Sequence, residues 1–179
     1  MTSIAIFGST GSIGLQTLDV VRAERDLFEV EVLAAGNSSQ AIIEQIDEFK
    51  PTLVVMANSK AAKEVQNARS STEVVSGEAA MREAAISADL VVNAVVGFAG
   101  LPVTIESLKA GKRLALANKE SLIAAGPVVQ RVRGASGSEL IPVDSEHCAL
   151  HQCLHGEAHK IDEVHKLLVT ASGGPFREW

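Results

Sequence analysis

Two carboxylates, Asp144 and Glu146, follow an apolar segment and could hold one metal ion together. Side chains two residues apart at the end of a strand can point the same way. Their oxygens favour a hard cation such as Mg²⁺ or Mn²⁺ over zinc. Without a metal the two charges should repel each other and raise the pKa of at least one carboxyl. The more common explanation of the pattern is an aspartate N-cap before an acidic first helical turn.

Histidines follow these carboxylates at steps of four residues, which would place them on one face of a helix. Gly156 predicts that the helix ends among them, so a histidine metal site is the less favoured interpretation. The histidines are His147, His151, His155 and His159.

A second polar group, Asn118, Lys119 and Glu120, follows the predicted strand 113–117. Such side chains are costly to bury without partners. They could cap the helix predicted over residues 122–133, with Glu120 near its positive end. Alternatively, Lys119 could bind an anionic substrate while its two neighbours contact a cofactor. The spacing favours neither interpretation.

Three glycines at the spacing G-x-x-G-x-x-G, in residues 8–14, lie between a predicted buried strand, Ile4–Phe7, and a helical pattern. Glycine lets the backbone approach a pyrophosphate, and the N-terminus of the following helix offers free N–H groups and partial positive charge. The hydroxyls of Ser9, Thr10 and Ser12 add donors. The alternative is a tight turn that needs glycine for its own backbone. In this strand-to-helix context the sequence predicts a dinucleotide site.

The loop that ends the second predicted strand, residues 36–39, contains no acidic residue. In dinucleotide-binding folds this position meets the adenosine ribose, and a site that prefers NAD usually places Asp or Glu there. A carboxylate would repel a 2′-phosphate, so the neutral donors Asn37, Ser38 and Ser39 favour NADP. The same residues could also cap the helix predicted over residues 40–49.

Two further glycine-containing loops follow predicted strands. Gly97–Gly100 comes after the strand predicted over 89–96, and Ser172-Gly173-Gly174 comes after the one predicted over 164–171. Ligands of open α/β sheets bind at the carboxyl edge of the strands. Exposed backbone N–H groups in such loops suit phosphate.

Strand and helix patterns alternate along the chain, which predicts an α/β fold with a Rossmann-like, doubly wound and mainly parallel sheet. Residues 89–96 are apolar on both faces, as in a central parallel strand, and residues 73–75 suit a short edge strand. The remaining predicted strands are 4–7, 28–35, 53–56, 113–117, 139–143 and 164–171. The predicted helices are one that carries Leu15, Leu18 and Val21, and the segments 40–49, 60–68, 79–86, 102–110 and 122–133.

The composition narrows the class of protein. The 179 residues are 46% apolar, enough for the core of one domain with a short appendage. A net charge of -6 argues against a general nucleic-acid surface, and no apolar run approaches the ~20 residues of a membrane span. Cys148 and Cys153 do not make a disulfide framework. With no signal or transit pattern, we expect a cytoplasmic protein.

Taken in order, these motifs resemble the 1-deoxy-D-xylulose 5-phosphate reductoisomerase family. The resemblance spans Ser3 to Arg177 and rests on residues 8–14, 97–100, 116–121, 142–147 and 171–177. It implies conversion of 1-deoxy-D-xylulose 5-phosphate, a phosphorylated sugar, to 2-C-methyl-D-erythritol 4-phosphate in the non-mevalonate route to isoprenoids. It also implies a bacterial cytoplasmic enzyme that uses NADPH and Mg²⁺ or Mn²⁺, with Co²⁺ as a further metal.

The resemblance implies roles for individual residues. Thr10, Gly11, Ser12 and Ile13 match contacts to the cofactor phosphates. Gly36, Asn37 and Ser38 match the segment that receives the 2′-phosphate, and Asn118 and Glu120 match further cofactor contacts. Lys119, Ser145 and Ser172 match substrate contacts, and Asp144 and Glu146 match metal ligands. Ser38 departs from the asparagine of many members, which shortens the donor at that position.

The resemblance also predicts how the chain is divided. Residues 1–143 are expected to form an NADPH-binding domain, and residues 144–179 to begin an α+β catalytic domain. Family members continue well past this length, so we expect an incomplete fragment that is inactive alone, from a protein that is a homodimer at full length. The alternatives are another NADP-dependent dehydrogenase, of the semialdehyde or homoserine type, and a non-catalytic NADPH-binding module.

Overall fold

A seven-stranded parallel sheet forms the centre of the computed structural model, which describes residues 1–154 and 164–170. The strand order is β4-β3-β2-β1-β5-β6-β7, and every neighbouring pair is parallel. The strands are β1 (Thr2–Phe7), β2 (Phe28–Ala35), β3 (Leu53–Met56), β4 (Glu73–Ser76), β5 (Leu90–Asn93), β6 (Arg113–Leu116) and β7 (Glu139–Pro142). The helices are α1 (Ser12–Ala23), α2 (Ser39–Phe49), α3 (Ser59–Ala68), α4 (Glu78–Ala84), α5 (Leu101–Lys109), α6 (Lys119–Ser136) and α7 (Ser145–Leu154), with a 3₁₀ turn η1 (Gly97–Gly100).

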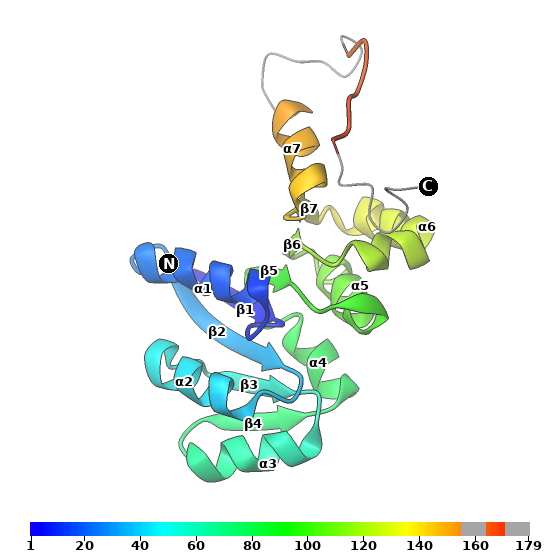
Figure 1. The fold of residues 1–179 in the computed structure, drawn as a ribbon. Helices are drawn as coiled ribbons and strands as arrows, with labels where there is room; N and C mark the ends of the chain where they lie inside the picture. The colour runs from blue at the N-terminus through cyan, green and yellow to red at the C-terminus, as the bar shows by residue number, and fades with distance from the viewer. Residues whose placement is uncertain (155–163, 171–179) are drawn as a thin grey trace, which may run out of the picture.

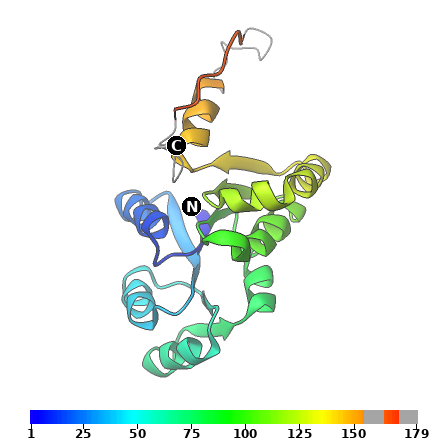
Figure 2. The same cartoon turned by 45° about the vertical axis from the view of Figure 1, so that its right-hand side comes forward.

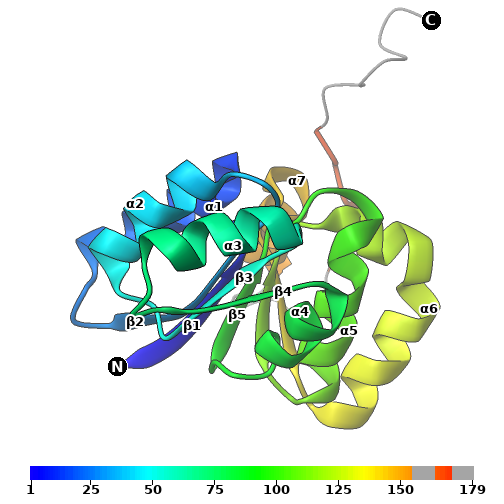
Figure 3. The same cartoon turned by 90° about the horizontal axis from the view of Figure 1, so that it is seen from below.

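Helices cover both faces of this sheet (Figures 1 and 3). Helices α1, α2 and α3 pack on one face over a core that includes Ile6 and Leu18. Helices α4, α5 and α6 pack on the other over a core that includes Phe7 and Leu108. The neighbours Ile6 and Phe7 thus point to opposite faces, as alternation along a strand requires. The expected Rossmann-like, doubly wound sheet is confirmed.

A bulge in β2 interrupts this alternation at Glu31. Ile4 pairs with Val30 while the next residue of β1, Ala5, pairs with Val32, so Glu31 is an extra residue. Val30 packs into the core beneath α1 to α3, whereas Val32 packs into the opposite one. The side-chain pattern of β2 therefore changes phase, and both halves of the strand still bury their apolar residues.

Two predicted strands differ from the structure by more than two residues at an end. β5 ends at Asn93, so residues 94–96 leave the sheet and Val96 is 88% exposed. Residues 164–170 have no regular secondary structure, and Leu167 and Leu168 are exposed. The strand predicted over 164–171 is therefore wrong in its described part. An apolar run forms a strand where a neighbouring edge satisfies its backbone, and no strand of the described sheet pairs with this segment.

Helix α6 begins at Lys119, three residues before the predicted start, so Lys119 and Glu120 form its first turn. Its backbone is non-helical at Ala125, two residues before Pro127, because a proline inside a helix removes a hydrogen bond and clashes with the preceding turn. Among the helices of residues 1–154 and 164–170, none is long and apolar enough to cross a membrane.

Helix α7 projects from the end of the sheet beyond β7 (Figures 1 and 2). None of its described residues is buried. It carries Cys148 and Cys153, which are both free thiols, as expected from two cysteines without a disulfide framework.

Candidate functional site

The candidate site lies at the carboxyl edge of the sheet, where β1 and β5 are neighbours. Phe7 pairs with Asn93 at the last position of both strands, and the Ala94 amide donates to the Phe7 carbonyl at 2.8 Å. The chain then leaves β1 for α1 on one face and β5 for α5 on the other. Such a change of direction leaves a crevice outside the strand ends.

The three glycines of the first loop differ in why a side chain would or would not fit at their positions. Gly8 has φ +83°, and a Cβ there would lie 2.6 Å from the Ala94 carbonyl oxygen. A Cβ on Gly14 would overlap the backbone of Gly8 and Ser9, so α1 packs against the loop only with glycine there. Gly11 has an ordinary φ of -85° and is exposed. A positive φ therefore does not explain this glycine.

Gly11 is the N-cap of α1, and no side chain caps this helix. The first N–H groups of α1 thus have no side-chain cap, and they carry the partial positive charge of the helix N-terminus. A Cβ on Gly11 would have one neighbour within 4 Å, the Gly8 carbonyl oxygen at 3.3 Å. The arrangement leaves room for an anion in front of the helix.

Ser9 does not offer its hydroxyl to a ligand, which corrects the expectation from sequence. It is fully buried, and its Oγ donates to Gln45 Oε1 at 2.7 Å. Gln45, on α2, in turn donates from Nε2 to the Ser9 carbonyl at 3.0 Å. This reciprocal pair fixes the loop to a helix 36 residues away. Thr10 is half-buried and Ser12 is exposed, so these two hydroxyls stay accessible.

We expect Gln45→Leu to weaken nucleotide binding about tenfold. The variant leaves the Ser9 hydroxyl and carbonyl buried without partners, at about 1–3 kcal/mol for each group, and it frees the loop to move. Gln66→Leu is the control, because Gln66 on α3 also bonds to main-chain groups away from the site, the Thr72 carbonyl in the loop before β4 and the Val74 amide in β4. Titration and thermal melting of both variants check this. Equal nucleotide affinities in the two variants would contradict it.

The loop after β2 presents exposed residues at 36, 37 and 38. Ser38 is the N-cap of α2, but its side chain makes no capping hydrogen bond. Ser38 therefore occupies the N-cap position, as the capping interpretation predicts, but its side chain does not cap the helix. Ser39 donates from Oγ to Glu64 Oε2 at 2.9 Å, which brings a carboxylate from α3 beside this otherwise neutral loop. Glu64 belongs to α3, which begins 20 residues after Ser39, so the local sequence pattern did not indicate this carboxylate.

Asn118 is the N-cap of α6 and is 1% exposed. Its Oδ1 accepts from the Ser121 amide at 3.0 Å, and its Nδ2 donates to the carbonyls of Val95 at 2.5 Å and Gly97 at 2.7 Å. A Cβ on Gly100 would lie 2.7 Å from Asn118 Nδ2. The capping interpretation of Asn118 is confirmed, and the same side chain holds the second glycine loop.

The acidic group after β7 meets the lysine group after β6. Lys119 Nζ lies 2.9 Å from Asp144 Oδ2, and both follow neighbouring parallel strands. Asp144 also accepts from the His147 amide at 3.2 Å, as the N-cap interpretation predicts, and its side chain is 9% exposed. Glu146 accepts from the Ser145 hydroxyl at 2.8 Å. The structure therefore brings Lys119 and Asp144 together.

Both carboxyls have a lowered pKa, which contradicts the expected increase. The hydrogen bond from Lys119 is the main cause for Asp144, and the one from Ser145 is the main cause for Glu146. The charge of Asp144 does oppose ionisation of Glu146, but it is a smaller contribution. Asp144 in turn raises the pKa of Lys119. Local donors thus outweigh the repulsion between the two acids.

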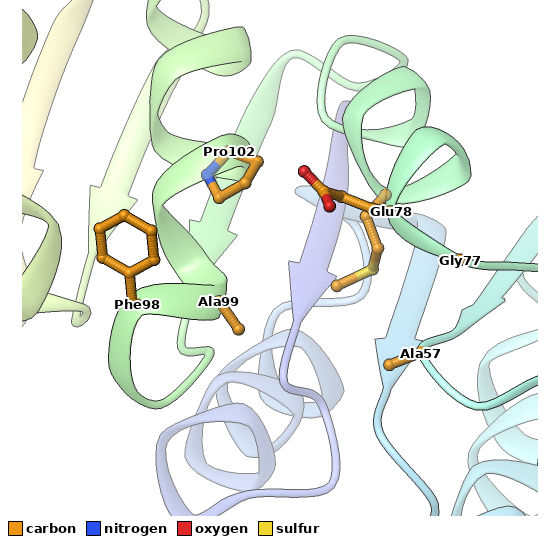
Figure 4. A pocket seen from close by; sticks show the side chains of 7 residues that line it. Ala57, Gly77, Glu78, Phe98, Ala99 and Pro102 are labelled. Atoms are coloured by element: carbon orange, nitrogen blue, oxygen red, sulfur yellow. The ribbon is translucent and has the colours of Figure 1, made fainter.

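An apolar pocket of about 340 Å³ opens at the same edge (Figure 4). Phe98, Ala99 and Pro102 line one side, after β5, and Ala57 and Glu78 line the other, after β3 and β4. Gly77 and Met81 complete it. The walls of this pocket come from three segments far apart in the chain, so local sequence patterns do not indicate it.

Some predicted residues cannot be placed. Four of them lie outside the described residues: Ser172, His155, His159 and Gly156. Glu120 is half-buried in the first turn of α6. Within residues 1–154 and 164–170, no three His, Cys, Asp or Glu side chains form a group that could hold a metal ion.

A parallel sheet with this strand order and a glycine turn from β1 into α1 defines an α/β protein of the Rossmann type. The family model for 1-deoxy-D-xylulose 5-phosphate reductoisomerase matches residues 4–126, and the model for the C-terminal domain of the same enzyme matches residues 140–179. The chain belongs to the 1-deoxy-D-xylulose 5-phosphate reductoisomerase family.

Individual relatives agree with this assignment. The reductoisomerase of Chlorobium phaeovibrioides is 48% identical over 182 residues, which cover 99% of this chain and 47% of the relative. That of Geobacillus kaustophilus is 46% identical, with the same coverage. The solved reductoisomerase of Zymomonas mobilis in complex with NADPH has a TM-score of 0.91 at 36% identity, covering 99% of this chain and 47% of that one. The chain thus spans about half the length of these relatives.

Proposed function

We propose that this chain supplies the NADPH-binding part, and a portion of the metal and substrate site, of a 1-deoxy-D-xylulose 5-phosphate reductoisomerase. The reaction converts 1-deoxy-D-xylulose 5-phosphate to 2-C-methyl-D-erythritol 4-phosphate. The observation that carries the proposal is the N-terminus of α1, which no side chain caps and whose N-cap residue, the exposed Gly11, lies at the edge where open α/β sheets bind ligands. A relative with NADPH bound has the same fold.

The nucleotide would occupy the loops after β1, β2 and β5. The backbone N–H groups and hydroxyls of residues 10–13 would hold the pyrophosphate, and residues 36–38 the 2′-phosphate. The apolar pocket would take the adenine, because one of its lining residues, Ala57, donates its amide to Ala35, the residue directly before this loop. Asn118 would act through the Val95 and Gly97 carbonyls that it holds, and Glu120 would contact the cofactor from the first turn of α6.

Asp144 and Glu146 would contribute oxygen ligands to a divalent cation. Their chemistry fits Mg²⁺ or Mn²⁺, and a solved relative is in complex with magnesium. When bound, NADPH would supply the hydride and the cation would polarise substrate oxygens. On metal binding, Asp144 would exchange its bond to Lys119 for the cation, and the Lys119 ammonium would then face the substrate. Ser145 and Ser172 would form hydrogen bonds with that substrate.

We further propose the division into residues 1–143 for the nucleotide and 144–179 for the beginning of a catalytic domain. Support comes from β7, the last strand of the described parallel sheet, which ends at Pro142, two residues before Asp144. The whole protein would be a homodimer in the bacterial cytoplasm.

Asn37→Asp is expected to weaken NADPH binding five- to tenfold and leave NADH binding unchanged. A new charge beside the 2′-phosphate costs about 1 kcal/mol or more, even in water-like surroundings, and NADH lacks that phosphate. Asn67→Asp, an exposed change on α3 with the same effect on net charge, is the control. Calorimetric titration measures both. A similar loss for NADH would show that residue 37 does not face the 2′-phosphate.

The activity is tested by joining residues 1–179 to the carboxyl-terminal half of the Chlorobium phaeovibrioides relative and following NADPH oxidation. We expect oxidation that requires both 1-deoxy-D-xylulose 5-phosphate and a divalent metal. Metal-independent activity would instead favour another NADP-dependent dehydrogenase. Nucleotide binding without turnover, with metal present, would favour a non-catalytic module.

A further inference from the structure

Four buried polar side chains behind the second glycine loop form one connected network. They come from the end of β5, from α5 and from the start of α6, and each is at most 1% exposed: Asn93, Thr104, Asn118 and Ser121. Asn93 Nδ2 donates to Thr104 Oγ1 at 2.9 Å, and Thr104 Oγ1 donates to Ser121 Oγ at 3.3 Å. Ser121 Oγ then donates to Asn118 Oδ1.

Both ends of this network bind the backbone of residues 95–100. Asn93 donates to the Gly100 carbonyl at 2.8 Å and accepts from the Val95 amide at 3.3 Å. Asn118 donates to the carbonyls of Val95 and Gly97. In the described residues no buried side-chain nitrogen or oxygen lacks a partner. A fully satisfied polar network of this kind rigidifies what it binds.

Apolar packing holds this loop only at its start, where Val95 packs against the core beneath α4 to α6. Val96 is 88% and Phe98 66% exposed, and Gly97 has φ +71° with nothing within 4 Å of a Cβ. The loop lies outside β5, so sheet hydrogen bonds do not hold it either. After Val95 its conformation therefore depends on the hydrogen bonds from Asn93 and Asn118 behind it, and Thr104 and Ser121 join those two side chains to each other.

We propose that Thr104 and Ser121 are positioning residues for nucleotide binding. They hold Asn93 and Asn118 in place, and through them the loop that would receive the nucleotide. Because Lys119 directly follows Asn118 and pairs with Asp144, the same network sets the distance between the nucleotide loop and the substrate end of the site. The inference rests on the proposed function, because it assigns the loop to the cofactor.

The test compares Thr104→Val and Ser121→Ala with Ser107→Ala. Ser107 is a fully buried serine on α5 that bonds to the Ala85 and Val103 carbonyls, outside the network. All three variants should melt at lower temperature. Well below melting, the first two should bind NADPH about tenfold more weakly in calorimetry, and Ser107→Ala should bind it normally. Thr104→Ser, which keeps the hydroxyl, should restore binding.

Amide hydrogen exchange of residues 95–100 is the second measurement, made without nucleotide. We expect faster exchange there in Thr104→Val and Ser121→Ala than in Ser107→Ala. Affinity and exchange that match the Ser107→Ala control would overturn the positioning role. If the unaltered chain binds no NADPH, the proposed function fails instead, and hydrogen exchange alone decides whether the network holds the loop.

Discussion

Replacing Gly11 by valine is expected to abolish measurable NADPH binding, a loss of a hundredfold or more, while the chain stays folded. Gly11 has φ -85° and an extended ψ, which a β-branched residue can adopt, and its Cβ would need a small shift of the Gly8 carbonyl oxygen 3.3 Å away. Its new side chain would fill the space in front of the α1 N-terminus, where we place the pyrophosphate. Loss of a glycine N-cap costs the helix about 1 kcal/mol or less.

Circular dichroism shows whether the Gly11→Val variant is folded, and calorimetric titration measures its affinity for NADPH. Gly134→Val is the matched control, because Gly134 is an exposed glycine on α6 with nothing within 4 Å of a Cβ. It should bind NADPH as the unaltered chain does. A folded Gly11→Val protein with normal affinity would show that the first glycine loop does not hold the phosphates.

The second large effect is expected at Asp144, in the hybrid protein described above. Asp144→Asn should lower turnover by more than the roughly 10- to 100-fold that is lost with a residue merely supporting a metal ligand. Asparagine caps a helix about as well as aspartate, so α7 should stay in place. NADPH binding should not change, because the hydrogen bonds of Asp144 within residues 1–154 and 164–170 join it to Lys119 and α7.

Glu139→Gln is the control for this variant. Glu139 is an exposed carboxylate at the start of the neighbouring β7, paired with Arg113, and its loss should leave turnover unchanged. Glu146→Gln should behave like Asp144→Asn. Full activity with either acidic residue removed would mean that the pair is not a metal site, and that Asp144 serves α7 and Lys119 alone.

The sheet could be predicted because its signal is local. β2 and β3 match the predicted residues 28–35 and 53–56, since short apolar runs bounded by polar turns are typical of buried parallel strands. The bulge at Glu31 could not be predicted, because it depends on the register between β1 and β2. Residues 164–170 misled the prediction for a similar reason: apolar composition does not say whether a partner edge exists.

The sequence predicted individual residues of the site, but not the contacts between them. Glycine spacing and polar residues at strand ends marked the right edge of the sheet, but not how those residues share their hydrogen bonds. Ser9 bonds to Gln45, 36 residues away in sequence. Asp144 bonds to Lys119, 25 residues away in sequence. The second contact also reversed the expected direction of the pKa shift. Such pairings follow from tertiary structure, which local patterns do not contain.

The central claim is that this chain binds NADPH at the loops after β1 and β2. Calorimetric titration of the 179-residue chain with NADPH and then NADH tests it most directly. The neutral, exposed loop at residues 36–38 predicts tighter binding of NADPH, by about tenfold, with one nucleotide per chain. Equal or reversed affinities would contradict the assignment of this loop to the 2′-phosphate, and no binding of either nucleotide would contradict the site itself.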